Sequence, residues 1–268
     1  MVTASAVLVL SSCEDKGETN KDNPRGWLLE SISVSVYNAL SDYNYQTMYD
    51  CEYDSLNRFT RFTTSPYNGT MSLNYNADGD LVGYYWIYQG RDWVRATFPK
   101  NGNIINFTIE QYLNRWSHTT VNGELELNTQ GLPVKVTSES ECRQLGVVGG
   151  DVSNWSNTVT LTWQNGNLIK TEWVREDEQG SSTGTKTYTY DNKRMPFYHC
   201  KTQKLNFWLF YYVGNDEFYG FNENNIKTET GDDGSTITYE YSYNDDGFPV
   251  TRTCATAVGT VTETYTYK

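Results

Sequence analysis

The side chains that carry catalysis or bind metal ions are few in this sequence and widely spaced. The chain has two histidines, His118 and His199, and they form neither an HExxH nor an HxxxH arrangement. His118 lies in the alternating segment 116–120, where a surface or core position is expected rather than a metal ligand. No GxSxG elbow, phosphate-binding loop or dinucleotide fingerprint is present. The sequence therefore predicts no cofactor, no metal site and no enzymatic activity.

Carboxylate pairs are the second chemistry to weigh, because glycosidases need two of them at a defined separation. The candidates stand as neighbours in turn-like segments: Asp177 and Glu178, Asp232 and Asp233, and Asp245 and Asp246. Asp in a turn bonds the backbone two residues on, and these positions do not follow the spacing of an EF-hand loop. Solvated turns are the favoured interpretation, and a weak surface Ca²⁺ site is an open alternative.

Four cysteines follow Cys13 along the chain: Cys51, Cys142, Cys200 and Cys254. An even number in an exported protein permits two disulfides, with three possible pairings. Their spacing contains neither a CxxC motif nor a zinc pattern. Disulfides and buried small apolar side chains are therefore both open interpretations.

Tryptophans are the best binding candidates, because an exposed indole stacks against the apolar face of a sugar ring. The predicted ligand-stacking residues lie near expected strand ends or loops: Trp86, Trp93, Trp116 and Trp155. Trp163 and Trp173 instead fit an alternating, core-facing pattern. Aromatic-rich β proteins usually bury such residues, so a core position for all of them is the alternative.

The composition indicates that β-strands position these side chains. Tyr, Trp and Phe number 22, 8 and 10, which makes 15% of the 268 residues aromatic and suits a pleated, half-buried surface. No long stretch has the apolar period of an amphipathic helix. The net charge of −12 argues against nucleic acid as a partner, because phosphate binding requires a basic surface.

Alternation of apolar and polar residues recurs from about residue 31 onward, as in 32–36, 159–163 and 237–243. Each such segment runs into a turn rich in Asn, Asp and Gly, residues that supply the positive φ and the side-chain bonds of a tight hairpin. Eight turns begin at Tyr53, Tyr75, Phe98, Leu127, Trp163, Tyr190, Phe221 and Tyr243. Eight hairpins predict about 16 strands, and a last strand is expected over 261–267.

The N-terminal residues predict where in the cell the protein is located. The apolar segment Val2 to Leu10 runs into Leu10-Ser11-Ser12-Cys13, which resembles the bacterial lipobox, whose Cys takes a diacylglycerol and becomes the mature N-terminus. Glu14 and Asp15 follow directly and resemble the surface-export signal of Bacteroidetes lipoproteins. No Lys or Arg precedes the apolar segment, so a start upstream of Met1 is an open alternative.

These features divide the chain into three parts. Residues 1–13 are the expected lipoprotein signal peptide and lipobox, and residues 14–26 are a polar, flexible tether. Residues 27–268 are expected to form a single repeat-built β domain.

The repeated turns carry a family resemblance. Tyr-Asp-x-x-x-Arg-Phe at 53–59 and Tyr-Asn-x-Asp-Gly-x-Leu at 75–81 resemble the YD repeats of RHS-type proteins. They are still more similar to degenerate copies in outer-surface lipoproteins of gut Bacteroidetes. The resemblance covers nearly the whole mature chain and implies no enzyme. It implies an all-β fold, a long antiparallel meander curled into a barrel-like or flattened half-barrel sheet. The units at Tyr53, Tyr190 and Phe221 lack the Gly, which leaves their turn types open.

The direction of the apolar face decides what such a sheet can be. A closed barrel of about 16 strands is too wide for its own side chains to fill. An inward apolar face therefore requires a flattened sheet, an open sheet, or a lumen that holds water or a ligand. An outward apolar face would make a membrane barrel, but the alternating face is rich in Tyr and a lipid anchor would be redundant.

The leading functional prediction is a non-enzymatic lipoprotein, lipid-anchored to the outer membrane and facing the cell exterior. It would bind a glycan or another envelope or host macromolecule. The alternative is a structural scaffold that associates with an outer-membrane partner. A glycoside hydrolase-type enzyme ranks third.

Overall fold

The computed structural model describes residues 28–38, 43–114, 117–144, 152–198, 222–256 and 259–268. Every regular element within these ranges is a β-strand. In chain order the strands are β1 (Leu29–Asn38), β2 (Tyr43–Tyr53), β3 (Phe59–Ser65), β4 (Gly69–Tyr75), β5 (Leu81–Tyr88), β6 (Arg91–Thr97), β7 (Lys100–Asn101), β8 (Ile104–Asn114), β9 (Ser117–Leu127), β10 (Pro133–Gln144), β11 (Val152–Gln164), β12 (Asn167–Asp177), β13 (Gly180–Arg194), β14 (Asn224–Gly231), β15 (Thr236–Tyr243), β16 (Pro249–Thr256) and β17 (Gly259–Tyr267).

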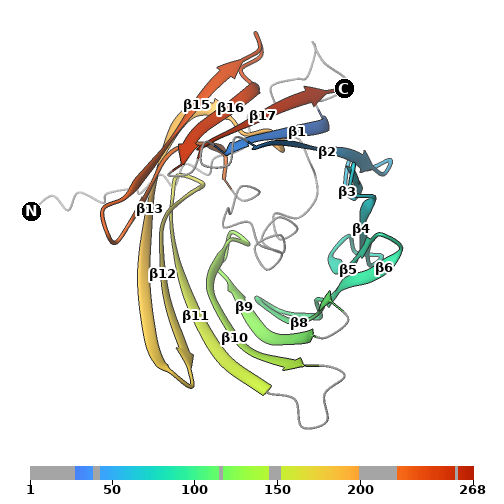
Figure 1. The fold of residues 1–268 in the computed structure, drawn as a ribbon, viewed down its shortest axis with the longest axis vertical. Coiled ribbons are helices and arrows are strands. Elements are labelled where there is room, and N and C mark those ends of the chain that lie inside the picture. The colour runs from blue at the N-terminus through green and yellow to red at the C-terminus, as the bar shows by residue number, and fades with distance from the viewer. Residues whose placement is uncertain (1–27, 39–42, 115–116, 145–151, 199–221, 257–258) are drawn as a thin grey trace, which may run out of the picture.

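The strands form one closed antiparallel barrel (Figure 1). Neighbours in sequence pair with each other, and β1 pairs with both β2 and β17, which closes the sheet. The two-residue β7 shares β8 as its partner with β6, so 16 strand positions make up the wall. The predicted all-β meander of about 16 strands is confirmed, and closure decides between a barrel and an open half-barrel.

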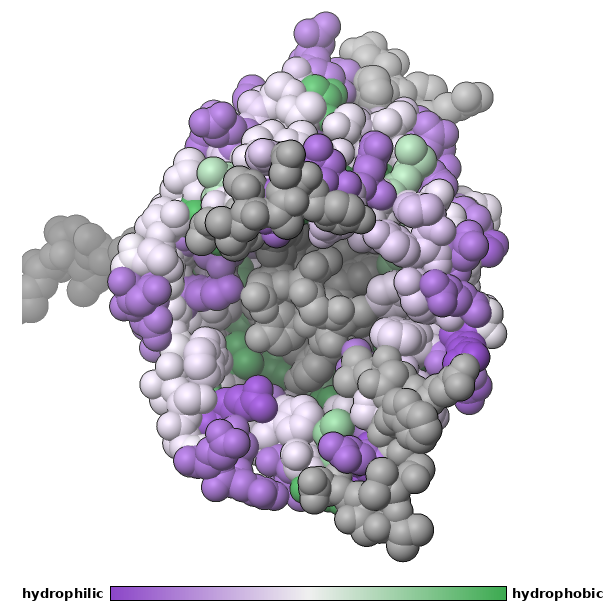
Figure 2. All heavy atoms as spheres, viewed as in Figure 1, coloured by the Kyte–Doolittle hydropathy of each residue, from purple (hydrophilic) through white to green (hydrophobic). Residues whose placement is uncertain are grey.

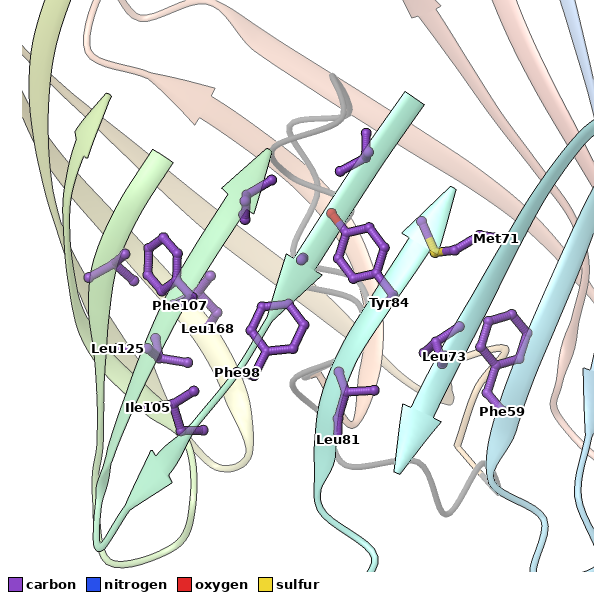
Figure 3. Close-up of a cluster of buried hydrophobic side chains, with 14 of the residues drawn as sticks. Phe59, Met71, Leu73, Leu81, Tyr84, Phe98, Ile105, Phe107, Leu125 and Leu168 are labelled. Carbon is purple, nitrogen blue, oxygen red and sulfur yellow. The ribbon is translucent and has the colours of Figure 1, made fainter. Parts of the chain in front are cut away.

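The apolar face of the sheet points into the barrel. Phe59, Met71, Tyr84 and Leu125 alternate with polar neighbours along their strands, and their exposed fractions are all 2% or less. Figure 3 draws these side chains as one cluster together with Phe98, Ile105, Phe107 and Leu168. The inner face is therefore a packed hydrophobic core over much of its area rather than a wet channel wall.

Polar side chains cover much of the outer face of the wall. Threonines dominate the outward positions of β15–β17: Thr236, Thr238, Thr251, Thr253, Thr262 and Thr264. Ion pairs lie on the outside as well, such as Lys135 with Glu126 at 3.8 Å. Polar residues therefore cover the side of the wall on which a membrane-spanning barrel carries its apolar band.

One end of the barrel collects the predicted Asx-rich turns, and we call it the hairpin end. The turn after β4 is representative, because Asn76 N donates to Asp80 O and Asp80 N donates to Asn76 Oδ1. The fourth position of this turn, Gly79, has φ of +87°. The turns that begin at Asp54, Asn128 and Asn244 repeat this pattern of backbone hydrogen bonds.

The three units that lack Gly resolve in two ways. The unit after Tyr53 lacks Gly but keeps the turn, because Asn57 takes the left-handed position at φ of +60°. The units predicted at Tyr190 and Phe221 are not separate hairpins. They flank one long connection between β13 and β14, and Phe221 itself lies outside the described residues. A turn motif repeated in sequence does not distinguish a tight hairpin from the two stems of a long excursion.

Aromatic side chains next to the hairpin end lock adjacent strands together. Each donates a side-chain hydrogen bond to a backbone carbonyl on the preceding strand of the wall. The pairs are Tyr53 with Leu29, Tyr75 with Phe59, Trp163 with Pro133, Tyr190 with Leu168, Tyr241 with Ile226, and Tyr267 with Pro249. The donor distances for Tyr53 and Tyr75 are 2.9 and 2.6 Å. The repeated Tyr therefore packs its ring in the interior and satisfies its hydroxyl at the strand end.

The stems of the β13–β14 connection are tied down by buried polar side chains. Asp191 accepts hydrogen bonds from Lys193 N, Asn225 N and Tyr243 Oη. Asn222 Oδ1 accepts from Leu168 N at 2.8 Å. Between these stems, Phe197 crosses to β3, where its ring lies 6.4 Å from that of Phe59. The described start of the connection therefore reaches from β13 to the β3 side of the hairpin end.

The structure shows whether three of the four cysteines after Cys13 form disulfides. No disulfide joins Cys51, Cys142 and Cys254, which lie on β2, β10 and β16. Cys51 and Cys254 are buried with the core cluster, so they act as small apolar side chains, while Cys200 lies outside the described residues. In the part of the chain that the structure describes, no helix is long and apolar enough to span a membrane.

Candidate functional site

The candidate site lies on the inner face of β11, β12 and β13, three of the longest strands of the wall. Toward the hairpin end, their inner residues Val159, Leu161 and Leu168 are buried. Toward the opposite end, which we call the far end, the inner residues become polar and exposed. The space-filling view is hollowed at its middle, with hydrophobic residues set back inside a mostly hydrophilic rim (Figure 2). The interior thus grades from core to surface along the same three strands.

Register places a mixed aromatic and polar strip on this surface. Trp155 of β11 pairs with Asp177, Asn157 pairs with Arg175, and Val159 pairs with Trp173. On the other side of β12, Arg175 pairs with Ser182 of β13. We call the residues Trp155, Asn157, Trp173, Arg175 and Ser182 the tryptophan strip. Strand geometry puts its two tryptophans roughly 14 Å apart, at opposite ends of a polar row.

Trp155 is half-buried, and the Arg175 guanidinium lies over its ring, 5.2 Å from the centroid. This is the distance range of a cation–π contact. Asp177 Oδ2 is 3.7 Å from Arg175 Nε, and the two side chains are 33% and 46% exposed. The pair is longer than a hydrogen bond, so Arg175 is held over the indole more than it is clamped by the carboxylate.

Trp173 lies flat on the neighbouring strand because its partner there is a glycine. A Cβ on Gly184 would lie 2.3 Å from Cζ2 of Trp173, which is closer than carbon atoms approach. The same pairing recurs deeper in the wall, where Phe107 covers Gly123. Gly184 therefore lets one face of the indole pack on the backbone of β13, so the ring lies parallel to the inner surface of the sheet.

A buried hydroxyl lies beside the strip. Ser140 of β10 is the register partner of Trp155, and it is only 4% exposed. Its Oγ has no hydrogen-bond partner among the described residues. Buried hydroxyls are usually hydrogen-bonded, and this one is an exception that is closed off from solvent.

The strands beyond the strip carry two close ion pairs on the inner face. Lys186 Nζ lies 2.7 Å from Glu229 Oε1, and Arg252 Nη2 lies 2.5 Å from Glu263 Oε1. Burial, followed by the Glu263 carboxylate, raises the pKa of the Tyr265 hydroxyl well above its usual 10.0. Glu229 and Glu263 each neutralise a cation, so neither stands as half of a catalytic carboxylate pair.

The structure places the other predicted stacking residues away from the strip. Trp86 lies within β5, packs against the core and has a buried indole nitrogen, so it is not at a strand end or loop as expected. Trp93 packs edge-on against Tyr88, with ring centroids 5.3 Å apart. Trp116 lies outside the described residues. Of the three candidates that the structure describes, Trp155 is the one that lies beside exposed polar residues on the inner face.

The remaining titratable candidates occupy surface positions. His118 stacks on Tyr112, with ring centroids 4.7 Å apart, and faces outward by register, while His199 lies outside the described residues. Asp177 and Asp233 accept backbone N–H bonds two residues on, from Gln179 and Ser235. Within the described ranges, no group of three or more His, Cys, Asp or Glu could hold a metal ion.

Two features of the inner face were not singled out from the sequence. Arg175 follows Trp173 by two residues, and the buried Arg252 precedes Cys254 by two, so alternation alone places each on the inner face. The signal was present, but charged residues inside an alternating strand are easily assigned to the solvent side.

No family model matches the sequence, and no curated protein sequence matches it. Two solved structures share the fold. A porin-like protein from Bacteroides uniformis is 14% identical, with a TM-score of 0.52 over 90% of this chain and 98% of that one. A porin-like protein from Bacteroides vulgatus is 13% identical, with a TM-score of 0.55 over 90% of this chain and 99% of that one. These likenesses establish a porin-like barrel fold for the chain.

Proposed function

We propose that this chain is a non-enzymatic binding protein of the outer membrane surface, anchored by a lipid on Cys13. Its barrel is the scaffold, and the tryptophan strip is the surface that takes a glycan or another envelope or host macromolecule. The observation that carries the proposal is the strip itself, in which Trp155 lies beside a polar row on the exposed part of the inner face and Trp173, packed against the core, ends that row. Aromatic faces and planar polar groups together are what a sugar chain requires.

The polarity of the wall supports anchoring rather than embedding. Membrane barrels turn alternating apolar residues toward lipid, and charged groups there are destabilising. Here the apolar residues face inward, and the outer face carries threonines and ion pairs such as Lys135 with Glu126. A barrel with this polarity is stable in water, and a lipid on Cys13 would hold it at the membrane.

The way in which the chain enters the barrel fits this arrangement. Leu28 and Lys268 exchange backbone hydrogen bonds of 3.2 and 2.9 Å at the hairpin end. A tether over residues 14–26 would therefore join the barrel at that end. The far end, where the strip is exposed, would then point away from the point of attachment.

A glycan array tests the proposal, with the mature chain carrying Cys13→Ser so that only the lipid is missing. We expect binding to a defined set of glycans, and we expect Trp155→Ala to remove it through loss of the stacking face. Tyr85→Ala is the matched control, because this residue is an exposed aromatic at 39% on the outer face. It should bind as the parent does.

Three results would overturn the proposal. A blank array together with a co-purified outer-membrane protein would favour the scaffold role. Turnover of a polysaccharide by the pure chain would establish an enzyme. Anchoring is tested separately by labelling cells with a tagged fatty acid, and failure of Cys13→Ala to abolish the label would exclude that residue as the lipid site.

A further inference from the structure

We infer that the tryptophan strip prefers a sparsely acidic oligosaccharide, in which a carboxylate on one ring meets Arg175 while neutral rings cover the indoles. The inference rests on the proposed function and specifies its ligand. It depends on how Arg175 is paired, on the neutral residues beside it in register, and on the net charge of the whole chain.

Arg175 differs from the other inward-facing cations in how it is paired. Lys186 and Arg252 lie 2.7 and 2.5 Å from their carboxylate partners, whose side chains are 9% and 17% exposed. Arg175 lies 3.7 Å from Asp177, and both of these side chains are open to solvent. A separation of this length is not a direct hydrogen bond. The N–H groups of the guanidinium can therefore donate to a second carboxylate.

Apart from Asp177, the immediate neighbours of Arg175 add no charge. Its register partners, Asn157 and Ser182, are both neutral. A ring at Trp155 would thus meet a planar cation, the Asn157 amide and the exposed Ser182 hydroxyl, with the Asp177 carboxylate at the edge of the strip.

The global charge limits how acidic the ligand can be. The chain carries a net charge of −12, so it repels a polymer with a charge on every unit. One carboxylate among neutral rings keeps the local attraction to Arg175 without that long-range repulsion. The roughly 14 Å between the two tryptophans gives room for several rings of such a ligand.

Calorimetric titration of the lipid-free mature chain with three matched probes tests the inference. The probes are a neutral oligosaccharide, the same oligosaccharide with one uronic acid, and a fully carboxylated polymer. We expect the singly acidic probe to bind about 10-fold more tightly than the neutral one, the scale of a hydrogen bond to a charged group. Methyl esterification of its carboxylate should remove that advantage in the unaltered protein, independently of any variant.

Variants then assign the preference to a residue. Arg175→Gln should bind the neutral and the singly acidic probes equally, and Arg175→Lys should keep part of the difference because it retains charge without the fork. Arg95→Gln is the matched control, because Arg95 is also an exposed Arg paired with a nearby Asp, but on the outer face. It should keep the full preference.

The outcomes separate this inference from the proposed function. Equal affinity for neutral and singly acidic probes would overturn the inference and leave the glycan-binding function standing. Tightest binding of the fully carboxylated polymer would contradict the sparse-charge argument. No binding to any probe would count against both.

Discussion

The two halves of the barrel wall bury different chemistry. The wall formed by β3–β9 packs hydrocarbon and aromatic side chains inward, and its buried polar residues are Thr64 and Thr119. The wall formed by β13–β17 is rich in tyrosine and contains Glu229 and Arg252, the buried charged residues within the described ranges. Both walls share alternating antiparallel strands and Asx-rich turns, although a long connection replaces the hairpin between β13 and β14. The shared alternation and turns therefore determine the strand pairing of the sheet, while the type of inward-facing residue varies from one wall to the other.

The difference in inward-facing residues between the two walls shows how a wide barrel fills its interior. Simple alternation of large apolar residues cannot fill a barrel of about 16 strands. In the β13–β17 wall the tyrosines reach inward and satisfy their hydroxyls on carbonyls or carboxylates, as Tyr241 does on Ile226 and Tyr265 does on Glu263. Long polar side chains fill space there at the cost of needing partners. The β3–β9 wall relies on such groups less, although its Tyr75 donates to the Phe59 carbonyl in the same way.

The largest expected effect comes from the β3–β9 wall. Phe59→Ala removes a ring that is 1% exposed and packs against Tyr53, Phe62 and Phe197. We expect a loss of about 4 kcal/mol in the free energy of unfolding, measured by urea denaturation, because the site cannot collapse around the cavity. Leu56→Ala, at a side chain that is 58% exposed, should change it by under about 0.5 kcal/mol. Equal losses would mean that this wall is not a packed core.

The ion pair of the β13–β17 wall should respond almost as strongly but can be rescued. Glu263→Gln removes the carboxylate that holds the buried Arg252, and we expect a loss of about 3 kcal/mol in the same assay. The double variant Arg252→Met, Glu263→Leu should recover most of that loss, because an apolar pair replaces a buried ionic one. A double variant that is as unstable as the single one would show that the pair contributes more than mutual neutralisation.

Alkaline pH should destabilise the barrel through its buried tyrosines. Burial raises the pKa of Tyr190, Tyr265 and Tyr267 above the ordinary 10.0, so the folded state holds these protons more tightly than the unfolded state. Their stabilising contribution is complete below pH 10 and falls as the pH rises above it, by up to about 1.4 kcal/mol per group and pH unit. Urea midpoints at pH 8 and pH 11 measure this. Tyr265→Phe should reduce the loss of stability per pH unit. An unchanged loss would show that Tyr265 does not contribute to the pH dependence.

The smallest effects should be the same in both walls, because the turns are shared. Asn76→Ala and Asn244→Ala each remove an Oδ1 acceptor that lies 2.8 or 2.9 Å from a backbone nitrogen across the turn. We expect each to cost about 1 kcal/mol by thermal or urea unfolding. Clearly unequal costs would contradict the idea that the walls differ only in their inward residues. Asn57→Gly should be tolerated better than Asn57→Ala, since the position has φ of +60°.

The strands and turns of the barrel could be predicted from the sequence because the patterns that specify them are local. Alternation gives the strands, and an Asx followed by a residue with positive φ gives the turns, so the strand number followed from counting. Closure did not follow, because it depends on whether Ile32 meets Tyr265, which no local pattern encodes. The merging of the Tyr190 and Phe221 units was missed for the same reason. Hydrogen bonds between distant residues such as Asp191 and Asn225 define those stems.

The candidate site was predictable residue by residue but not as a group. Trp155 was singled out for its type, and its partners Arg175 and Ser140 lie on other strands, so only the register brings them together. Trp86 was singled out on the same grounds and lies against the core instead. The difference between an exposed and a buried indole lies in strand length and barrel curvature, and neither is written in the neighbouring residues.

The pairing of β1 with β17 closes the barrel through contacts between residues far apart in the sequence. Until Thr260–Tyr267 dock, β1 presents an unpaired edge, and the most non-local contacts of the wall are still unmade. Folding should therefore be slow, because this closing pair forms last. Loss of β17 would leave unpaired edges on β1 and β16, which favour aggregation.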